Sequence, residues 1–136
     1  QWKDNLRLRK INVAHTNGGK ITDRSIANLC NIVRHFSTSL THVNLSYVPL
    51  DGRSESDLGA ALGTLKNIEV LVLRGCKISH KGFKDILHVF SIVPSLLNTL
   101  DLEHNNLTHA AVAAICGVIE GENCSLTSLN VGYNLI

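Results

Sequence analysis

The sequence predicts an α/β solenoid, a segment of a horseshoe-shaped stack with five parallel strands on its concave side and four helices on its convex side. Two observations predict this fold. A short apolar pattern typical of a strand begins five times along the chain, and a helical apolar pattern follows it four times. Both patterns return at a nearly constant interval, and a period of about 20–50 residues is typical of proteins made of stacked repeats.

The five predicted strands share apolar residues at their first, fourth and sixth places. Their starts lie 32, 28, 29 and 29 residues apart, and the first interval is longer because Asn17, Gly18 and Gly19 extend one turn. Side chains alternate across a strand, so we expect the fourth and sixth places to face the core. The third, fifth, seventh and eighth places should then form the concave surface. The predicted strands are residues 8–13, 40–45, 68–73, 97–102 and 126–131.

A helix is predicted after each of the first four strands. One apolar residue follows each strand, namely Ile21, Leu50, Ile78, Leu107 and Ile136. Eight and twelve positions later come further apolar residues, at the spacing of one helix face. These pairs are Leu29 and Val33, Leu58 and Leu62, Ile86 and Phe90, and Ile115 and Ile119. The residues expected to cap the helix N-termini are Thr22, Asp51, Ser79 and Thr108.

Composition narrows the classes of function. The chain has 136 residues, of which 44% are hydrophobic and 18% charged, with a net charge of +2. This length suits one domain, so we expect residues 1–136 to form a single domain. The near-neutral charge argues against nucleic acid as a partner, and the absence of long apolar runs argues against a membrane. The four cysteines lack metal-binding spacing, so we expect reduced thiols and a cytoplasmic protein.

Residues Leu97 to Leu107 fit the pattern L-x-x-L-x-L-x-x-N-x-L, and on this pattern the chain resembles leucine-rich-repeat proteins. The period of 28–29 residues is similar to that of the ribonuclease-inhibitor-like subclass. This resemblance implies about 4.5 repeats and a structural turn role for the asparagine place, which Asn105, Asn134 and the substitute Cys76 occupy. It implies no single function, because the subclass includes enzyme inhibitors, immune sensors, actin-capping regulators and a Ran GTPase activator.

Two departures from the repeat lead to further expectations. Val48 holds the asparagine place of the second repeat without a hydrogen-bonding group, so we expect a locally different turn there. The chain stops at Ile136, where a fifth helix would begin, and no polar capping unit precedes Leu8. Because solenoids need capped ends, we expect the chain to be a segment of a longer solenoid.

The sequence contains no recognisable catalytic constellation. The glycines before Lys20 lack the spacing of a phosphate-binding loop. His80 and His109 hold the same place in neighbouring repeats, but two histidines without a third ligand make a poor zinc site, so we predict that both are solvated. The sequence therefore predicts no enzymatic activity, no cofactor, no metal and no small-molecule substrate.

The concave surface is the predicted binding site for another protein. Val70 and Val72 would expose adjacent apolar side chains, and aromatic residues recur at the eighth place, where tyrosine is typical of binding hot spots. Arg74 should form a surface ion pair with Glu103, worth less than about 1 kcal/mol. The residues predicted to contact the partner are Tyr47, Val70, Val72, Arg74, Asp101, Glu103, His104 and Tyr133.

Two other functions remain open at this point. The chain could be an architectural segment of a cytoskeletal or ciliary assembly, which predicts contacts on the helices or loops instead of the strands. It could also regulate GTPase turnover, since the repeats resemble those of the Ran GTPase activator; such a protein completes a partner's active site and is not an enzyme alone.

Overall fold

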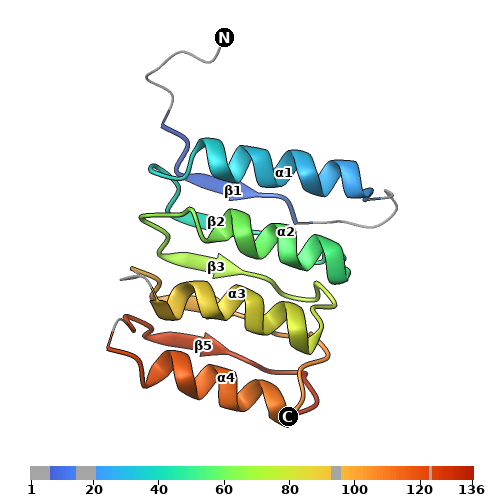
Figure 1. The fold of residues 1–136 in the computed structure, drawn as a ribbon, viewed down its shortest axis with the longest axis vertical. Helices are drawn as coiled ribbons and strands as arrows, with labels where there is room; N and C mark the ends of the chain where they lie inside the picture. The colour runs from blue at the N-terminus through green and yellow to red at the C-terminus, as the bar shows by residue number, and fades with distance from the viewer. Residues whose placement is uncertain (1–6, 15–20, 93–95, 123) are drawn as a thin grey trace.

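The computed structural model describes residues 7–14, 21–92, 96–122 and 124–136. Within them, strands and helices alternate along the chain (Figure 1). The strands are β1 (Lys10–Asn12), β2 (His42–Asn44), β3 (Val70–Val72), β4 (Thr99–Asp101) and β5 (Ser128–Asn130). The helices are α1 (Asp23–His35), α2 (Gly52–Leu62), α3 (His80–Ile92) and α4 (His109–Ile119).

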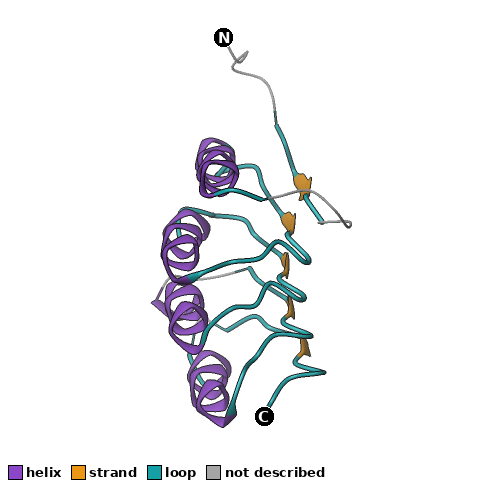
Figure 2. Ribbon diagram, turned by 90° about the vertical axis from the view of Figure 1, so that its right-hand side faces the viewer, coloured by secondary structure: helices purple, strands orange, loops and turns teal. Residues whose placement is uncertain are grey.

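The strands form one parallel sheet in the order β1-β2-β3-β4-β5. The third places of the five repeats lie side by side, because Lys10 pairs with His42, His42 with Val70, Val70 with Thr99, and Thr99 with Ser128. Figure 2 shows the helices in one layer and the strands in the other. The predicted α/β solenoid and the predicted alignment of its repeats are therefore confirmed.

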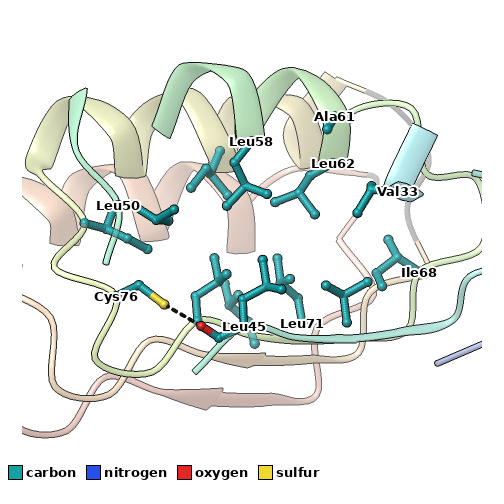
Figure 3. Packing of buried hydrophobic residues seen from close by; sticks show 14 of the residues in the cluster. Val33, Leu45, Leu50, Leu58, Ala61, Leu62, Ile68, Leu71 and Cys76 are labelled. Atoms are coloured by element: carbon teal, nitrogen blue, oxygen red, sulfur yellow. Dashed lines mark hydrogen bonds between the residues drawn. The ribbon is translucent and has the colours of Figure 1, made fainter. Parts of the chain in front are cut away.

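A hydrophobic core lies between the sheet and the helices (Figure 3). In the second to fourth repeats the fourth- and sixth-place residues are almost completely buried, as predicted, and Leu58 and Leu62 of α2 pack against them from the helical layer. Burying a leucine side chain stabilises a fold by about 1.5–3 kcal/mol, so the repeated pattern is the main source of stability. The buried strand residues are Val43, Leu45, Leu71, Leu73, Leu100 and Leu102.

Some core predictions near the two ends of the repeat stack are wrong, although Ile11, Leu29 and Val33 of the first repeat are buried as predicted. Val13, Ile119 and Ile136 are predicted to face the core, but they are 44%, 50% and 54% exposed. Leu129 and Val131 are only half-buried. Val13 follows the first strand, Ile119 ends the last described helix, and Ile136 follows the last strand, so within the described chain each has a neighbouring element of its own layer on one side only.

The predicted N-caps of the first three helices have the expected contacts. Thr22 Oγ1 accepts a hydrogen bond from the Ser25 amide at 3.2 Å, Asp51 Oδ1 accepts one from the Ser54 amide at 3.3 Å, and Ser79 Oγ accepts one from the Gly82 amide at 3.1 Å. The hydrogen bonds from Ser54 lower the pKa of the Asp51 carboxyl group. These caps begin the helices at the positions that the repeat predicts.

Glu55 of α2 is a buried acidic residue that the sequence analysis did not single out. Its carboxylate accepts hydrogen bonds from the backbone amide of Ser79 and from Ser79 Oγ, the latter at 2.7 Å. Gly82 makes room for it, because a Cβ at that position would overlap the carboxylate. Glu55 therefore joins α2 to the N-terminus of α3, where a negative charge is favourable. A signal existed, since Glu55 falls one turn before Leu58 on the buried face of the helix.

Candidate functional site

The sheet surface that faces away from the helices is the candidate site, and we call it the exposed sheet face. It consists of the third, fifth, seventh and eighth places of the repeats. Because the strands are parallel and in register, the residues of one place form a row across the sheet. In β2, β3 and β4 the third- and fifth-place residues are partly exposed and the fourth-place residue is buried, so the predicted alternation holds there.

The fifth-place row has a structural role that the sequence analysis missed. In four repeats, an Asn or Asp at this place accepts a hydrogen bond through Oδ1 from the backbone amide two residues later. A side-chain acceptor of this kind stabilises the turn that follows the strand. The four bonds run from Ala14 to Asn12 at 3.2 Å, from Ser46 to Asn44 at 3.0 Å, from Glu103 to Asp101 at 2.9 Å, and from Gly132 to Asn130 at 3.1 Å.

Val72 is the exception in this row, because its side chain cannot accept a hydrogen bond. Together with Val70 it forms a partly exposed apolar pair in the central strand. Polar residues flank the pair, since Val72 lies between Asn44 and Asp101 in the sheet register. The third repeat thus replaces a turn-stabilising residue with an apolar side chain in the middle of the exposed sheet face.

The eighth-place residues of the second to fifth repeats have left-handed backbone geometry, and that of the first repeat, His15, lies outside the described residues. Their φ angles are 61° at Tyr47, 63° at Gly75, 59° at His104 and 52° at Tyr133. Only glycine adopts this conformation without a steric cost, so the two tyrosines and the histidine are held in a strained geometry. Tyr47 is 48% exposed and Tyr133 is 81% exposed. The predicted aromatic row is present, at residues whose backbone favours glycine.

The expectation of a different turn at Val48 is confirmed for its hydrogen bonding. The preceding Tyr47 nevertheless has the same φ sign as its counterparts. The Val48 side chain is buried in the core, and its own amide donates to the Leu45 carbonyl oxygen at 3.0 Å. A backbone bond therefore occupies the carbonyl group that a side chain at this place can reach.

The aromatic residues lie in two groups. The Tyr47 ring lies over Gly75 in the neighbouring repeat, where an added Cβ would come within 2.5 Å of Cδ1 and Cε1 of the ring. His104 and Tyr133 form a tilted pair with ring centroids 6.0 Å apart. The glycine at the eighth place of the third repeat thus makes room for a tyrosine from the second.

Arg74, Asp101 and Glu103 form one ionic network in front of β3 and β4. Arg74 Nη2 lies 2.9 Å from Asp101 Oδ2 and 2.8 Å from Glu103 Oε2. The predicted pair with Glu103 is thus present, and the pair with Asp101 was not predicted. The hydrogen bond and the charge of Asp101, followed by the charge of Glu103, raise the pKa of the Arg74 guanidinium group. Because the Arg74 side chain is 37% exposed, the network orders these side chains more than it stabilises the fold.

The three predicted turn residues each form a hydrogen bond to the backbone of the preceding repeat. Asn105 is buried and donates through Nδ2 to the Leu73 carbonyl oxygen at 2.8 Å, while its Oδ1 accepts from the Ile78 amide at 3.2 Å. Asn134 makes the corresponding bonds to the fourth repeat, and Cys76 donates through Sγ to the Leu45 carbonyl oxygen at 3.1 Å (Figure 3). Burial raises the pKa of the Cys76 thiol to about 12, so Cys76 remains a neutral donor.

Two further sequence predictions need correction. Ser46 is predicted to project onto the concave surface, but it is buried and its hydroxyl donates to Asn44 Oδ1 at 2.6 Å. His80 is predicted to be solvated, but it is half-buried, and its Nδ1 has no partner in the described part of the chain. Helix α3 has helices on both sides, whereas His109 lies on α4 and is exposed as predicted.

The described residues contain no group of three or more His, Cys, Asp and Glu side chains arranged to hold a metal ion. None of the helices in the described ranges is both long and apolar enough to span a bilayer.

Comparison with known proteins supports the fold assignment. A family model described as "Leucine Rich repeat" matches residues 94–116 and 122–136. No curated protein matches the chain. The matched residues include β4, most of α4, and β5, and the same unit recurs in the earlier repeats of the structure. Domains of this kind commonly bind other proteins. The chain is therefore similar to leucine-rich-repeat proteins over these two stretches, and its fold is an α/β solenoid consistent with that of leucine-rich repeats.

Proposed function

We propose that this chain is a non-catalytic interaction scaffold that binds another protein on its exposed sheet face. The observation that carries the proposal is Val72. Four repeats have a turn-stabilising Asn or Asp at the fifth place, and the third repeat has a partly exposed valine instead. Stability alone does not favour this exchange, because it removes a hydrogen bond and exposes apolar surface. Contact of Val72 with a partner would explain why the third repeat has a valine at this place.

The eighth-place residues support the same proposal. Tyr47, His104 and Tyr133 occupy a backbone conformation that costs about 1–3 kcal/mol for a non-glycine residue, and such strain collects at functional sites. A sheet held in register by core packing also loses little conformational entropy on binding. The proposed contact residues are therefore Tyr47, Val70, Val72, Arg74, Asp101, Glu103, His104 and Tyr133, with Asp101 also stabilising its own turn.

The proposal also covers the cellular compartment, the repeat subclass and the type of partner. We assign it to the cytoplasm and to the ribonuclease-inhibitor-like subclass, with a protein as its partner and with no need for a cofactor, nucleic acid, membrane or small-molecule substrate. The free thiols of Cys30, Cys76, Cys116 and Cys124 support a reducing compartment. The 28–29-residue period and helices of 11 to 13 residues support the subclass.

The test replaces contact residues by residues that the repeat already uses at the same place. Val72→Asn introduces the fifth-place residue of β1, β2 and β5, and Tyr133→Gly introduces the eighth-place residue of the third repeat. Val72→Asn restores a turn hydrogen bond, worth about 0.5–1.5 kcal/mol. Tyr133→Gly relieves strain. Each variant should unfold at an equal or higher urea concentration than the wild type, and each should lose partner binding.

Affinity capture from cell lysate with quantitative mass spectrometry measures the binding. The matched control is Ile32→Thr, which removes an exposed apolar side chain from α1 on the opposite layer. We expect a partner that is captured by the wild type and by the control, and that is lost in the Val72→Asn, Tyr133→Gly double variant. A partner retained by the double variant would contradict the proposal.

The architectural alternative has one observation in its favour. A groove of about 290 Å³ lies between α1 and α2, and its lining includes Asp23, Arg24, Arg53 and Asp57. Mixed charge of this kind is also typical of a solvated helix surface. If the captured partner is lost in an Arg24→Ala, Arg53→Ala variant and retained by the sheet variant, the helical layer carries the function. The resemblance to the Ran GTPase activator gains no support from any described residue.

A further inference from the structure

The eighth-place turns give their aromatic side chains a fixed position. The left-handed backbone directs the side chains of Tyr47, His104 and Tyr133 from the same edge of the exposed sheet face, with Gly75 between the first two, and φ is 59° at His104 and 52° at Tyr133. Neighbouring parallel strands lie about 4.8 Å apart, which brings the residues of adjacent repeats into contact range. The result at the C-terminal end of the row is the His104–Tyr133 ring pair, with 81% of Tyr133 exposed.

The charge beside this ring pair is negative. Arg74 carries one positive charge, and its two partners, Asp101 and Glu103, carry two negative charges, so the network has a net charge of −1. Glu103 directly precedes His104 and lies in the row next to Gly132, which directly precedes Tyr133. The uncompensated negative charge therefore lies next to the exposed aromatic pair.

Two contacts hold the Glu103 carboxylate in position through one of its two oxygen atoms. Its Oε2 lies 2.8 Å from Arg74 Nη2 and accepts a hydrogen bond of 2.8 Å from Asn130 Nδ2. Both contacts use Oε2, which leaves Oε1 to accept a hydrogen bond from outside the domain. Gly132 places no side chain beside it, and a Cβ there would lie 3.8 Å from Glu103 Cγ. The carboxylate is thus held by two contacts to Oε2, and the Glu103 side chain remains 19% exposed.

We propose that the protein partner inserts an Arg or Lys side chain between the Glu103 carboxylate and the rings of His104 and Tyr133. This inference rests on the proposed function and specifies the chemistry of the partner. A cation gains from the face of an aromatic ring and from a charge-assisted hydrogen bond to a fixed carboxylate. Acidic side chains or phosphate groups would be repelled by the excess negative charge of the network. An arginine fits best, because its planar group can stack on a ring and donate sideways at once.

The test selects ligands without assuming their sequence. A displayed library of random 16-residue peptides is selected on the 136-residue chain, and the dissociation constants of the enriched peptides are then measured. We expect the enriched peptides to share an Arg or Lys whose replacement by Gln weakens binding about tenfold. Glu103→Gln should weaken binding to a similar degree, and Tyr133→Gly should weaken it further. Glu120→Gln, the same charge change at the exposed end of α4, is the control and should have no effect.

A double-mutant cycle identifies the contact. If the basic residue of the peptide contacts Glu103, its replacement by Gln should no longer matter in the Glu103→Gln variant. Three results would each overturn the inference. The enriched peptides could share no basic residue, the effect of their basic residue could persist in the Glu103→Gln variant, or the selection could return no binder. Peptides of the first two kinds that still lose binding in the Val72→Asn, Tyr133→Gly variant would leave the proposed function intact. Peptides that bind that variant as well as the wild type would contradict both.

Discussion

The asparagine turn residues offer a direct test of how burial sets the value of a hydrogen bond in this fold. Asn105 and Asn134 make corresponding bonds to the preceding repeat, but Asn105 is 2% exposed and Asn134 is half-buried. Replacing either residue by alanine removes the same type of side chain from the same place in the repeat. The difference between the two variants therefore isolates the effect of burial.

The loss expected for Asn105→Ala follows from the groups it leaves behind. The Ile78 amide and the Leu73 carbonyl oxygen are bonded to Asn105 at 3.2 and 2.8 Å, and both belong to fully buried residues. A buried polar group without a partner costs about 1–3 kcal/mol, so two of them cost about 2–6 kcal/mol. The groups that Asn134 bonds, the Leu107 amide and the Leu102 carbonyl oxygen, also belong to fully buried residues. Asn134 itself is half-buried, however, so water can take the place of its side chain, and Asn134→Ala should cost only about 1 kcal/mol.

Urea unfolding followed by far-UV circular dichroism measures both losses from the transition midpoints, provided that the slope stays constant. Asn106→Ala is the control, because Asn106 is an exposed neighbour of Asn105 and should change stability by no more than about 0.5 kcal/mol. Equal losses for Asn105→Ala and Asn134→Ala, or a loss below about 0.5 kcal/mol for Asn105→Ala, would refute the burial argument.

Two further substitutions test the packing. Leu100→Ala, at a fully buried fourth place, should cost about 2–5 kcal/mol in the same urea assay, and an unchanged midpoint would contradict the inward orientation of that side chain. Gly75→Ala should cost about 1–3 kcal/mol because φ is 63° and the new Cβ meets the Tyr47 ring. The Gly75→Ala, Tyr47→Ala double variant should lose less than the sum of the single losses, and strict additivity would rule out the contact between the ring and Gly75.

The repeat period predicted the sheet order, the register and the core of the central repeats, because side-chain alternation and a fixed spacing leave one consistent arrangement. The same pattern failed for Val13 and Ile119, since an apolar residue is buried only if a neighbouring repeat covers it. The spacing of apolar residues is a property of one repeat, so it does not show whether a neighbouring repeat covers a given side chain. Glu55 is the opposite case, a charged residue that is buried. Its burial depends on the space left by Gly82 in the next helix, which the spacing within one repeat does not reveal.

The sequence predicted where the residues of the candidate site lie, but not the structural role that each of them has there. Alternation placed Val72, Tyr47 and Tyr133 on the exposed sheet face. It could not reveal that Asn44 and its counterparts stabilise turns, because that role depends on a bond to the backbone two residues later. Nor could it reveal the left-handed φ of the tyrosines, which is set by the turn that joins strand to helix. These two facts distinguish residues that serve the fold from those proposed to serve a partner.

Photo-crosslinking tests most directly whether the exposed sheet face binds the partner. A photoreactive phenylalanine analogue is introduced either at Tyr133, on the exposed sheet face, or at Val112, an exposed residue of α4 in the helical layer. After irradiation of cells that produce each variant, adducts are identified by mass spectrometry. Binding on the exposed sheet face predicts a specific protein adduct from residue 133 and none from residue 112. The same adduct from residue 112, with none from residue 133, would contradict it and assign the function to the helical layer.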